Sequence, residues 1–316
     1  MNIVVLDAEA MNPGDLDWAD LKHLGKVKIF GQTSEELVVE RSRDAEILVV
    51  NKVKLDGTVI ERLPRLKFIS VTATGYDNID LEATSKHEVM VSNAVNYSSE
   101  SVAQYVLACI LDNVQALREH DQAVKDGQWS ASRGFSFTLR PLQDLSSLCV
   151  GVIGLGNIGI TVDRLLSNIG VKVLGWNRSD KSSQIRGTQV SLQTLLHSAD
   201  IISMHLPLTV ETQGLIGQEE FKLMKKGACL INAGRGALVD KVALLQALDQ
   251  GIVSRAYIDV FDSEPPPSDD PILQHASVIV TPHLAWATVA SRERLMSQTV
   301  ENIEAFIKGN PIRIVR

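Results

Sequence analysis

The sequence predicts an α/β protein with two doubly wound parallel sheets, and two features of the chain carry this prediction. Short runs of β-branched residues alternate with helical patterns along almost all of the 316 residues, which is typical of parallel strands covered by helices on both faces. The alternation stops once, between residues 99 and 147, and then restarts. A chain of this length therefore suits two domains of ordinary size.

The first series of elements predicts a sheet of parallel strands. The candidate strands are short apolar runs at residues 3–6, 27–30, 47–50, 68–71 and 90–91. Helical patterns separate them at residues 15–24, 34–42, 56–63 and 80–87. A longer helix is predicted over 99–121, where apolar residues recur at helical spacing, and a polar loop follows from Gly127 to Ser147.

The second series predicts a second parallel sheet. Its candidate strands lie at residues 149–153, 172–176, 201–205, 228–232, 256–260 and 278–281. Helices are predicted at residues 158–169, 192–198, 218–224, 241–249 and 288–308. Strand and helix alternate in the order of a dinucleotide-binding sheet. Charged residues of these helices are expected on solvated faces, namely Asp163, Arg164, Arg292 and Glu293.

The composition excludes several classes of protein. Hydrophobic residues make up 45% and charged residues 22% of the chain, a mixture typical of soluble globular proteins and not of disordered ones. The net charge of -7 argues against nucleic acid or an anionic membrane as the main partner. No apolar run approaches the ~18 residues of a membrane span, and the start of the chain lacks the pattern of a signal peptide. We therefore expect a cytoplasmic protein.

The cysteines predict neither a disulfide framework nor a metal site. Cys109, Cys149 and Cys229 each stand in an apolar run. No pair has the spacing of metal ligands, and an odd number does not make a disulfide framework. Buried free thiols in a reducing compartment are the expected state.

A glycine motif predicts a site for the pyrophosphate of a dinucleotide. Gly154-Leu155-Gly156-Asn157-Ile158-Gly159 follows a predicted strand and opens a predicted helix, which is the context that makes such a motif specific. Gly154 permits a tight turn, Gly156 lets the backbone approach the phosphates, and Gly159 lets the helix pack on its strand. The helix N-terminus would offer N–H groups to the phosphates.

The end of the next strand bears on the choice of cofactor. An acidic residue commonly holds the ribose 2′-hydroxyl at this place, but here the chain has Asn177-Arg178-Ser179. Asn does not repel a 2′-phosphate, and Arg can bind one through two donors. The sequence therefore favours NADP(H), with NAD(H) still possible if Arg178 stacks on adenine or points to water.

Three polar residues stand just beyond the carboxyl ends of predicted parallel strands. They are Arg235, Glu264 and His283, and ligands bind at that edge of open α/β sheets. Arg can bind a carboxylate, His can exchange a proton near neutral pH, and Glu beside His favours and orients the imidazolium. The alternatives are an ordinary surface His and a solvated loop acid.

Several motifs in one order resemble the D-2-hydroxyacid dehydrogenase family along nearly the whole chain. They are Ala73-Thr74-Gly75-Tyr76-Asp77-Asn78-Ile79-Asp80, the glycine motif, His205-Leu206-Pro207-Leu208-Thr209, Asn232-Ala233-Gly234-Arg235-Gly236 and Pro282-His283. Within the family, Asn51-Lys52-Val53 and His283-Leu284-Ala285-Trp286-Ala287 look most like glycerate dehydrogenases, also called hydroxypyruvate reductases. Many relatives have glycines where this chain has Ala285-Trp286, and this difference favours the glycerate dehydrogenases within the family.

The resemblance implies roles for matching residues. Arg235 would bind the substrate carboxylate and carbonyl, His283 would be the general acid, and Glu264 would be its partner. The substrate would also meet the N–H groups of the loop Ala73-Thr74-Gly75, and Lys52 and Trp286 are further candidates, although a solvated Lys and an interface Trp are the alternatives. The cofactor would be bordered by Gly154, Gly156, Asn157, Ile158, Gly159, Asn177, Arg178, Ser179, His205, Leu206, Pro207, Ala233 and Asp259.

The resemblance also implies the domain organisation. Residues 1–98 and 285–316 would form a flavodoxin-like substrate-binding domain, and residues 99–284 a Rossmann dinucleotide-binding domain, with a cleft between them. A homodimer built on the dinucleotide-binding domain is expected.

The implied reaction is hydride transfer between NAD(P)H and a small 2-oxoacid. Reduction of hydroxypyruvate to D-glycerate is the first expectation, and reduction of glyoxylate to glycolate is the second. A phosphoglycerate dehydrogenase without a regulatory domain is an alternative, although the substrate loop shows no second basic cluster for a phosphate. A dinucleotide-sensing scaffold that binds other proteins is an alternative of a different class.

Overall fold

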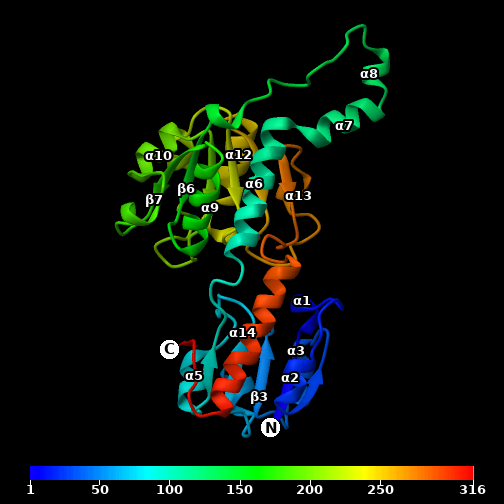
Figure 1. Ribbon diagram of the computed structural model, residues 1–316, viewed down its shortest axis with the longest axis vertical. Helices are drawn as coiled ribbons and strands as arrows, with labels where there is room; N and C mark the ends of the chain where they lie inside the picture. Colours follow the sequence, from blue (N-terminus) through cyan, green and yellow to red (C-terminus); the bar gives the residue numbers. More distant parts are fainter. Residues whose placement is uncertain (316) are drawn as a thin grey trace. The chain divides into compact units, whose positions relative to one another are not determined.

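The computed structural model describes residues 1–315 and divides them into two compact units (Figure 1). One unit contains Met1–Ser98 together with the chain from Ala287 onward, and the other contains Ser99–Trp286. The second unit thus ends at residue 286, whereas the sequence suggested residue 284. That one unit binds substrate and the other the dinucleotide stays a prediction.

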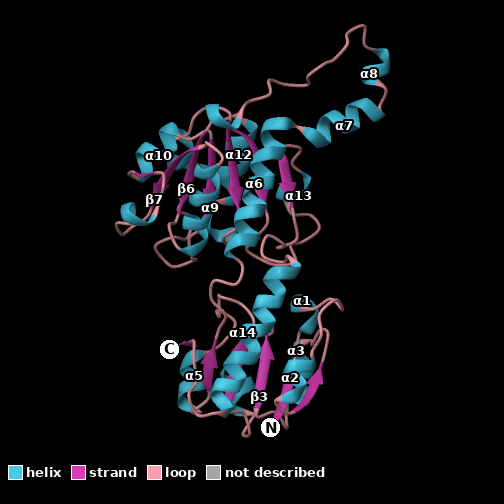
Figure 2. Ribbon diagram, in the orientation of Figure 1, coloured by secondary structure: helices cyan, strands magenta, loops and turns pink. Residues whose placement is uncertain are grey.

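The first unit is a six-stranded sheet in the order β13-β5-β4-β3-β1-β2, with helices on its faces (Figure 2). The strands are β1 (Asn2–Val5), β2 (Lys26–Ile29), β3 (Ile47–Val50), β4 (Phe68–Val71), β5 (Met90–Ser92) and β13 (Ile314–Val315). The helices are α1 (Ala8–Met11), α2 (Ala19–His23), α3 (Glu35–Ser42), α4 (Gly57–Glu61), α5 (Leu81–Lys86) and α14 (Val289–Ile307). Only β13 pairs in the antiparallel direction among these described strands.

The core of the first unit joins distant parts of the chain. Every residue of β3 and β4 is buried, as a parallel strand covered on both faces requires. The ring of Phe306 on α14 stacks on Phe68, with 4.5 Å between ring centroids. Arg292 of α14 is buried and forms two hydrogen bonds with the carboxylate of Asp15, at 2.6 and 2.7 Å, so its expected place on a solvated face was wrong.

The second unit is a seven-stranded parallel sheet in the order β12-β11-β10-β9-β6-β7-β8. Its strands are β6 (Cys149–Ile153), β7 (Lys172–Trp176), β8 (Thr188–Gln189), β9 (Ile201–Met204), β10 (Ala228–Asn232), β11 (Val253–Ile258) and β12 (Val278–Val280). Its α-helices are α6 (Ser99–Gln115), α7 (Leu117–Lys125), α8 (Gln128–Ala131), α9 (Asn157–Asn168), α10 (Leu192–Ser198), α11 (Gln218–Leu223), α12 (Lys241–Asp249) and α13 (Pro271–Gln274). The two parallel sheets confirm the predicted fold class.

A long helix over 99–121 was expected, but the structure divides it into α6 and α7 at Ala116. Ala116 has a φ of 50°, a left-handed conformation that L residues seldom adopt. The guanidinium of Arg118 turns back to the Asp112 carboxylate, at 2.8 Å, and Tyr257 donates to the same carboxylate. These contacts hold the bend although no Gly or Pro marks it in the sequence.

Residues 117–147, which we call the arm, carry α7 and α8 away from the sheet of the second unit (Figure 1). The two-residue strands β8 and β13 and the short helices α1 and α8 were not predicted, because elements this short leave no periodic pattern. Asp163 of α9, expected in solvent, is buried and accepts hydrogen bonds from the backbone N–H groups of Arg186 and Gly187.

Candidate active site

The candidate catalytic residues follow three neighbouring strands of the second unit. Arg235 follows β10, Glu264 follows β11 and His283 follows β12. Since β10, β11 and β12 are parallel and adjacent, their carboxyl ends lie at the same edge of the sheet. The glycine motif follows β6, Asn177 follows β7 and His205 follows β9, so these predicted cofactor residues belong to this edge too.

His283 and Glu264 are in direct contact. The Nδ1 atom of His283 lies 2.6 Å from Oε2 of Glu264, and the backbone N–H of Phe261 donates to the other carboxylate oxygen, Oε1, at 3.0 Å. Glu264 is therefore oriented by its own loop, and it fixes the imidazole through Nδ1. This arrangement leaves Nε2 as the ring atom that can exchange a proton with a ligand.

Asp259 holds the backbone of His283 and of the two residues that follow it. His283 has a φ of 52°, and its N–H donates to the carbonyl oxygen of Asp259 at 2.8 Å. The N–H groups of Leu284 and Ala285 each donate to the Asp259 carboxylate at 2.9 Å. Burial raises the pKa of this carboxyl group, and the hydrogen bonds it accepts oppose that shift.

Asn232 holds the backbone that carries Arg235. Its amide Nδ2 donates to the carbonyl oxygen of Arg235 at 2.9 Å, and its Oδ1 accepts from Gly234 N–H at 3.1 Å. Nη1 of Arg235 donates to the carbonyl oxygen of Gly234 at 2.9 Å. Asn232 is buried at the end of β10, where sequence reasoning assigned it no role.

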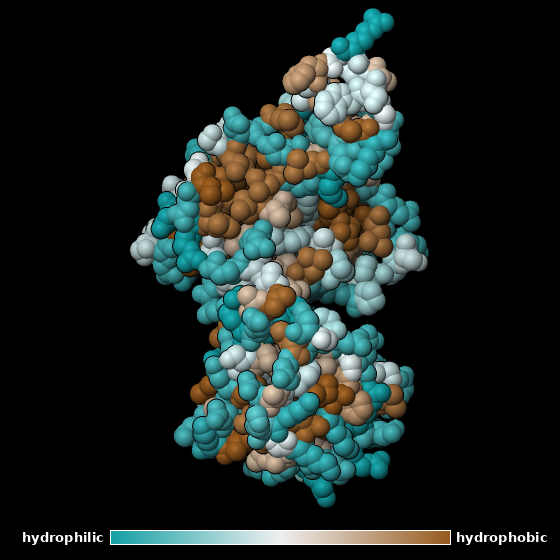
Figure 3. All heavy atoms as spheres, turned by 45° about the vertical axis from the view of Figure 1, so that its right-hand side comes forward, coloured by the Kyte–Doolittle hydropathy of each residue, from teal (hydrophilic) through white to brown (hydrophobic). Residues whose placement is uncertain are grey.

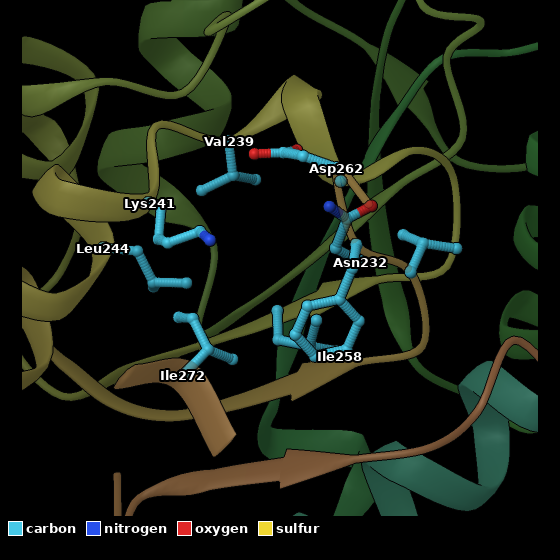
Figure 4. A pocket seen from close by; sticks show the side chains of 10 residues that line it. Asn232, Val239, Lys241, Leu244, Ile258, Asp262 and Ile272 are labelled. Atoms are coloured by element: carbon cyan, nitrogen blue, oxygen red, sulfur yellow. The ribbon is translucent and has the colours of Figure 1, made fainter. Parts of the chain in front are cut away.

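A small pocket lies beside Asn232 (Figure 4). Val239, Leu244 and Ile272 supply much of its wall, and Lys241 reaches toward it. The ammonium of Lys241 is 2.6 Å from Oδ2 of Asp270, so its charge is already paired. Because the wall is largely apolar, this pocket offers little to an anionic substrate.

The glycine motif forms a cradle that fits a dinucleotide. Gly154 has a φ of 97°, and a Cβ on Gly159 would lie 1.9 Å from the carbonyl oxygen of Gly154. These two positions therefore require glycine. A Cβ on Gly156 would meet nothing within 4 Å, so open space lies at the N-terminus of α9, where helix N–H groups favour phosphate.

His205 supplies an unpaired polar atom at the end of β9. Its Nε2 lies 2.9 Å from Oγ of Ser203, whereas the buried Nδ1 has no hydrogen-bond partner among residues 1–315. Burial lowers the pKa of His205 to about 4, so the ring is neutral at pH 7. A buried nitrogen without a partner is a place where a bound ligand can complete the hydrogen bonding.

Asn177 links the end of β7 to the glycine motif. Its Oδ1 accepts from the N–H of Leu155 at 3.1 Å, and its Nδ2 donates to Oγ of Ser179 at 2.9 Å. Arg178 is exposed, and its charge contributes to lowering the pKa of Glu211, after that residue's hydrogen bonds to Thr209 and its own backbone.

In the first unit, Asp7 clamps the loop that carries Lys52. The Asp7 carboxylate accepts from the backbone N–H groups of Asn51, Lys52 and Val53, at 2.8, 2.6 and 3.1 Å. The Lys52 side chain is exposed. This clamp could not be predicted from the sequence, because a carboxylate that follows a strand can serve many purposes.

The loop Ala73-Thr74-Gly75 follows β4 in the same unit. Its carbonyl groups are used, since Ala73 accepts from Ala94 N–H and Thr74 accepts from Nδ2 of Asn93. The N–H groups of Thr74 and Gly75 donate to no other residue within 1–315, which is the state expected of an anion-binding loop.

The described residues contain neither a metal-binding cluster nor a membrane-spanning helix. Within residues 1–315, no group of three or more His, Cys, Asp or Glu could hold a metal ion. No helix in the described part of the chain has the length and apolar character needed to cross a membrane. The three cysteines are buried free thiols, and Trp286 is partly buried at the end of the second unit.

Known proteins share this architecture and sequence. The NAD binding domain of the D-isomer specific 2-hydroxyacid dehydrogenases matches residues 107–285. The chain is 36% identical to a hydroxypyruvate reductase of Blautia hydrogenotrophica, over 100% of this chain and 99% of that protein. It is also 36% identical to a glycerate dehydrogenase of Methylorubrum extorquens, over 99% of this chain and 98% of that protein.

A solved structure agrees. An acyclic imino acid reductase in complex with NADPH and D-Arg superposes with a TM-score of 0.86 and 30% identity, over 100% of both chains. The match of the NAD binding domain and the identity along the full length confirm the resemblance that the motifs indicated. The chain therefore belongs to the family of D-isomer specific 2-hydroxyacid dehydrogenases and is an oxidoreductase of that kind.

Proposed function

We propose that this enzyme reduces a small 2-oxoacid with His283 as the proton donor. The observation that carries the proposal is the 2.6 Å contact between His283 Nδ1 and Glu264, at the strand edge that also bears Arg235. A bound NAD(P)H supplies the hydride that the carbonyl carbon receives. His283 Nε2 donates a proton to the carbonyl oxygen, while Arg235 binds the carboxylate and stabilises charge on that oxygen.

Hydroxypyruvate is the substrate we propose first, with D-glycerate as its product. Relatives named hydroxypyruvate reductase and glycerate dehydrogenase support this choice. Initial rates with hydroxypyruvate, glyoxylate, pyruvate and 3-phosphohydroxypyruvate test it directly. A higher kcat/KM for any other of these acids contradicts the choice, and a preference for the phosphorylated acid would restore the phosphoglycerate alternative.

We also propose substrate contacts for Trp286 and for residues of the first unit. Lys52 and the N–H groups of Thr74 and Gly75 bind the substrate carboxylate, and Trp286 contacts the rest of the molecule. Replacing Lys52 by Met should raise KM for the oxoacid and leave KM for the cofactor unchanged, because only the substrate loses a charge partner.

We further propose that NADPH is preferred over NADH. Asn177 stands where a carboxylate would repel the 2′-phosphate of NADPH, and the guanidinium of Arg178 can donate two hydrogen bonds to that phosphate. A solved relative that binds NADPH supports this proposal. A charge-assisted contact of roughly 1–3 kcal/mol would make kcat/KM for NADPH about 5- to 150-fold higher than for NADH.

Measuring kcat/KM for both cofactors at low salt tests the preference. Asn177→Asp combined with Arg178→Ala should reverse it, because the double variant regains a ribose acceptor and loses the phosphate contact. Equal values for the two cofactors in the wild type contradict the proposal without affecting the oxoacid chemistry.

We propose that the enzyme is a homodimer joined through the arm and the neighbouring face of α6. Large apolar side chains are exposed there, namely Leu111, Leu117, Val124, Trp129, Phe135, Leu139 and Leu142. Figure 3 shows broad apolar areas on the surface of this unit, and surfaces of this kind commonly mark protein interfaces. A second copy would cover them.

Light scattering tests the dimer. The double variant Leu117→Ser/Phe135→Ser should be largely monomeric, whereas Val242→Ser, which changes a side chain that is 64% exposed on α12, should match the wild type. A monomeric wild type contradicts the proposal. We also place the enzyme in the cytoplasm, the compartment that suits its three buried free thiols.

A further inference from the structure

A chain of hydrogen bonds leads from α6 to the loop of His283. The phenol oxygen of Tyr105 lies 2.8 Å from Oγ1 of Thr281. Thr281 donates to Oδ1 of Asp259 at 2.5 Å, and the Asp259 carboxylate accepts from the N–H groups of the two residues that follow His283. Neither Tyr105 nor Thr281 is used by the proposed reaction itself.

The direction of the protons in this chain follows from the chemistry of its members. A threonine hydroxyl has a single hydrogen, and Thr281 gives it to the Asp259 carboxylate. Tyr105 must therefore donate to Thr281. Burial raises the pKa of the Tyr105 phenol well above its usual value, so the phenol keeps its proton over the whole working range of pH. The chain of donors thus ends on the carboxylate.

The carboxylate at the end of this chain holds a backbone conformation that is unfavourable by itself. His283 adopts a φ of 52°, in the left-handed region that favours glycine. Hydrogen bonds from the N–H groups of residues 283, 284 and 285 all end on Asp259. The His283 bond ends on the main-chain carbonyl oxygen of Asp259, and the other two end on its carboxylate. If the carboxylate rotated or took up a proton, the bonds from Leu284 and Ala285 would weaken and the turn would relax.

We propose that Tyr105 and Thr281 are positioning residues that fix the Asp259 carboxylate and, through it, the place of the His283 imidazole. This inference rests on the proposed role of His283 as the proton donor. It predicts that loss of the Thr281 hydroxyl slows the chemical step, because this hydroxyl acts on the His283 loop through the Asp259 carboxylate. A small displacement of a catalytic group is enough, because proton transfer depends steeply on geometry.

The first experiment compares Thr281→Val with Thr281→Ser. Valine has nearly the same shape but removes the hydroxyl that donates to Oδ1 of Asp259, which then accepts only from the Leu284 N–H, and it takes away the acceptor of the Tyr105 phenol. We therefore expect kcat to fall about tenfold while KM for NADPH stays unchanged. Serine keeps the hydroxyl and should retain most of the activity. Tyr105→Phe removes only the outer donor and should cause a smaller fall in kcat.

Tyr257→Phe is the matched control. Tyr257 is a buried tyrosine of the same unit that donates to a carboxylate, that of Asp112, at 2.7 Å, but it is not part of the chain to Asp259. Its loss should therefore lower stability without lowering kcat. If Thr281→Val keeps the kcat of this control, or if Thr281→Ser is as slow as Thr281→Val, the proposal is wrong.

A second measurement reads the position of His283 without turnover. The ¹³Cε1–¹H resonance of His283, assigned by its absence in His283→Gln, should move in Thr281→Val and Tyr105→Phe but not in Tyr257→Phe. An unmoved resonance in both variants contradicts the positioning role. A wild type that reduces no 2-oxoacid contradicts the proposed function instead, and the resonance still decides this inference. If Thr281→Val does not fold, Tyr105→Phe decides it.

Discussion

Both oxygens of Glu264 are needed to hold His283 in place. One oxygen binds the imidazole and the other binds the backbone of Phe261, so the carboxylate cannot swing without losing one of the two contacts. Nδ1 of the ring is thereby occupied, and only Nε2 is left for the substrate. At the scale of single residues, the contact of Glu264 with Nδ1 therefore determines that Nε2 is the atom of His283 that donates the proton.

Replacing His283 by Ala should lower kcat by about 10²- to 10⁴-fold, which is the usual contribution of a positioned acid. Cofactor affinity should change little, because the pyrophosphate cradle belongs to β6 and α9. Steady-state rates with fluorescence titration of NADPH measure the two effects separately. A variant that keeps more than about a third of the wild-type kcat would rule out His283 as the essential acid.

Replacing Arg235 by Lys should raise KM for the oxoacid and lower kcat, although the positive charge is kept. A lysine ammonium cannot form the two parallel hydrogen bonds that a guanidinium gives to a carboxylate. Arg178→Lys is a control for the general loss of a guanidinium, and it should change the kinetics of the cofactor alone. Unchanged kinetics of Arg235→Lys with the oxoacid would make Arg235 structural.

At the scale of elements, two glycines at the junction of β6 and α9 have different roles. Gly159 is needed for α9 to pack on its strand, and Gly156 is proposed to leave space for phosphate. Gly159→Ala should lower both thermal stability and NADPH affinity, because a Cβ there would collide with the Gly154 carbonyl and push α9 from its strand. Gly156→Ala has room for its Cβ, so it should fold normally but bind NADPH weakly, since the methyl group occupies the space proposed for phosphate.

Thermal melts with and without NADPH distinguish the two variants. Gly217→Ala controls for replacing a glycine at a helix N-cap, because Gly217 caps α11 with a φ of -115° and its new Cβ would meet no atom closer than 3.5 Å. If Gly156→Ala binds NADPH as tightly as the wild type, the open space at this turn is not the phosphate site.

The elements also show how far the sequence could predict the structure. Strands β3 and β6 were predicted to the residue, because β3 is a buried apolar run bounded by polar residues and β6 is an apolar run that ends at the glycine motif. The bend at Ala116 was missed because it depends on Arg118 reaching Asp112, which is a tertiary contact. Burial of Arg292 was missed for a similar reason, since its partner Asp15 lies far away in the chain.

In the candidate site, too, some residues could be predicted from the sequence and others could not. Residues that bear chemistry, such as His283 and Arg235, could be found from their place after strands and from family motifs. The residues that support them could not be predicted, because Asn232 and Asp7 act through hydrogen bonds to backbone groups and Thr281 acts through one to the Asp259 carboxylate. Such contacts depend on the folded path of the chain and leave no spacing pattern in the sequence.

At the scale of the whole molecule, His205 should make the enzyme sensitive to acid. Burial lowers its pKa to about 4, whereas the unfolded chain binds this proton near pH 6.5. Between these pH values the unfolded state binds more protons than the folded state. The contribution of His205 to the free energy of unfolding is therefore fully present above about pH 6.5 and is lost as the pH falls. The loss attributable to His205 at pH 5 is roughly 2 kcal/mol.

Urea unfolding at pH 7.5 and pH 5 checks this prediction. The fall in the free energy of unfolding between these values should be smaller in His205→Gln than in the wild type, since other groups titrate alike in both proteins. His197→Gln, which changes an exposed histidine of α10, should behave as the wild type. An equal fall in all three proteins contradicts the prediction.

The split first unit has a consequence for how the protein is made. On the ribosome, residues 1–98 emerge first, but their sheet lacks β13 and their core lacks α14, whose Phe306 covers Phe68. The second unit is continuous in sequence and can complete its sheet earlier. The nascent first segment therefore exposes apolar surface until synthesis ends, and during that time it is prone to aggregation.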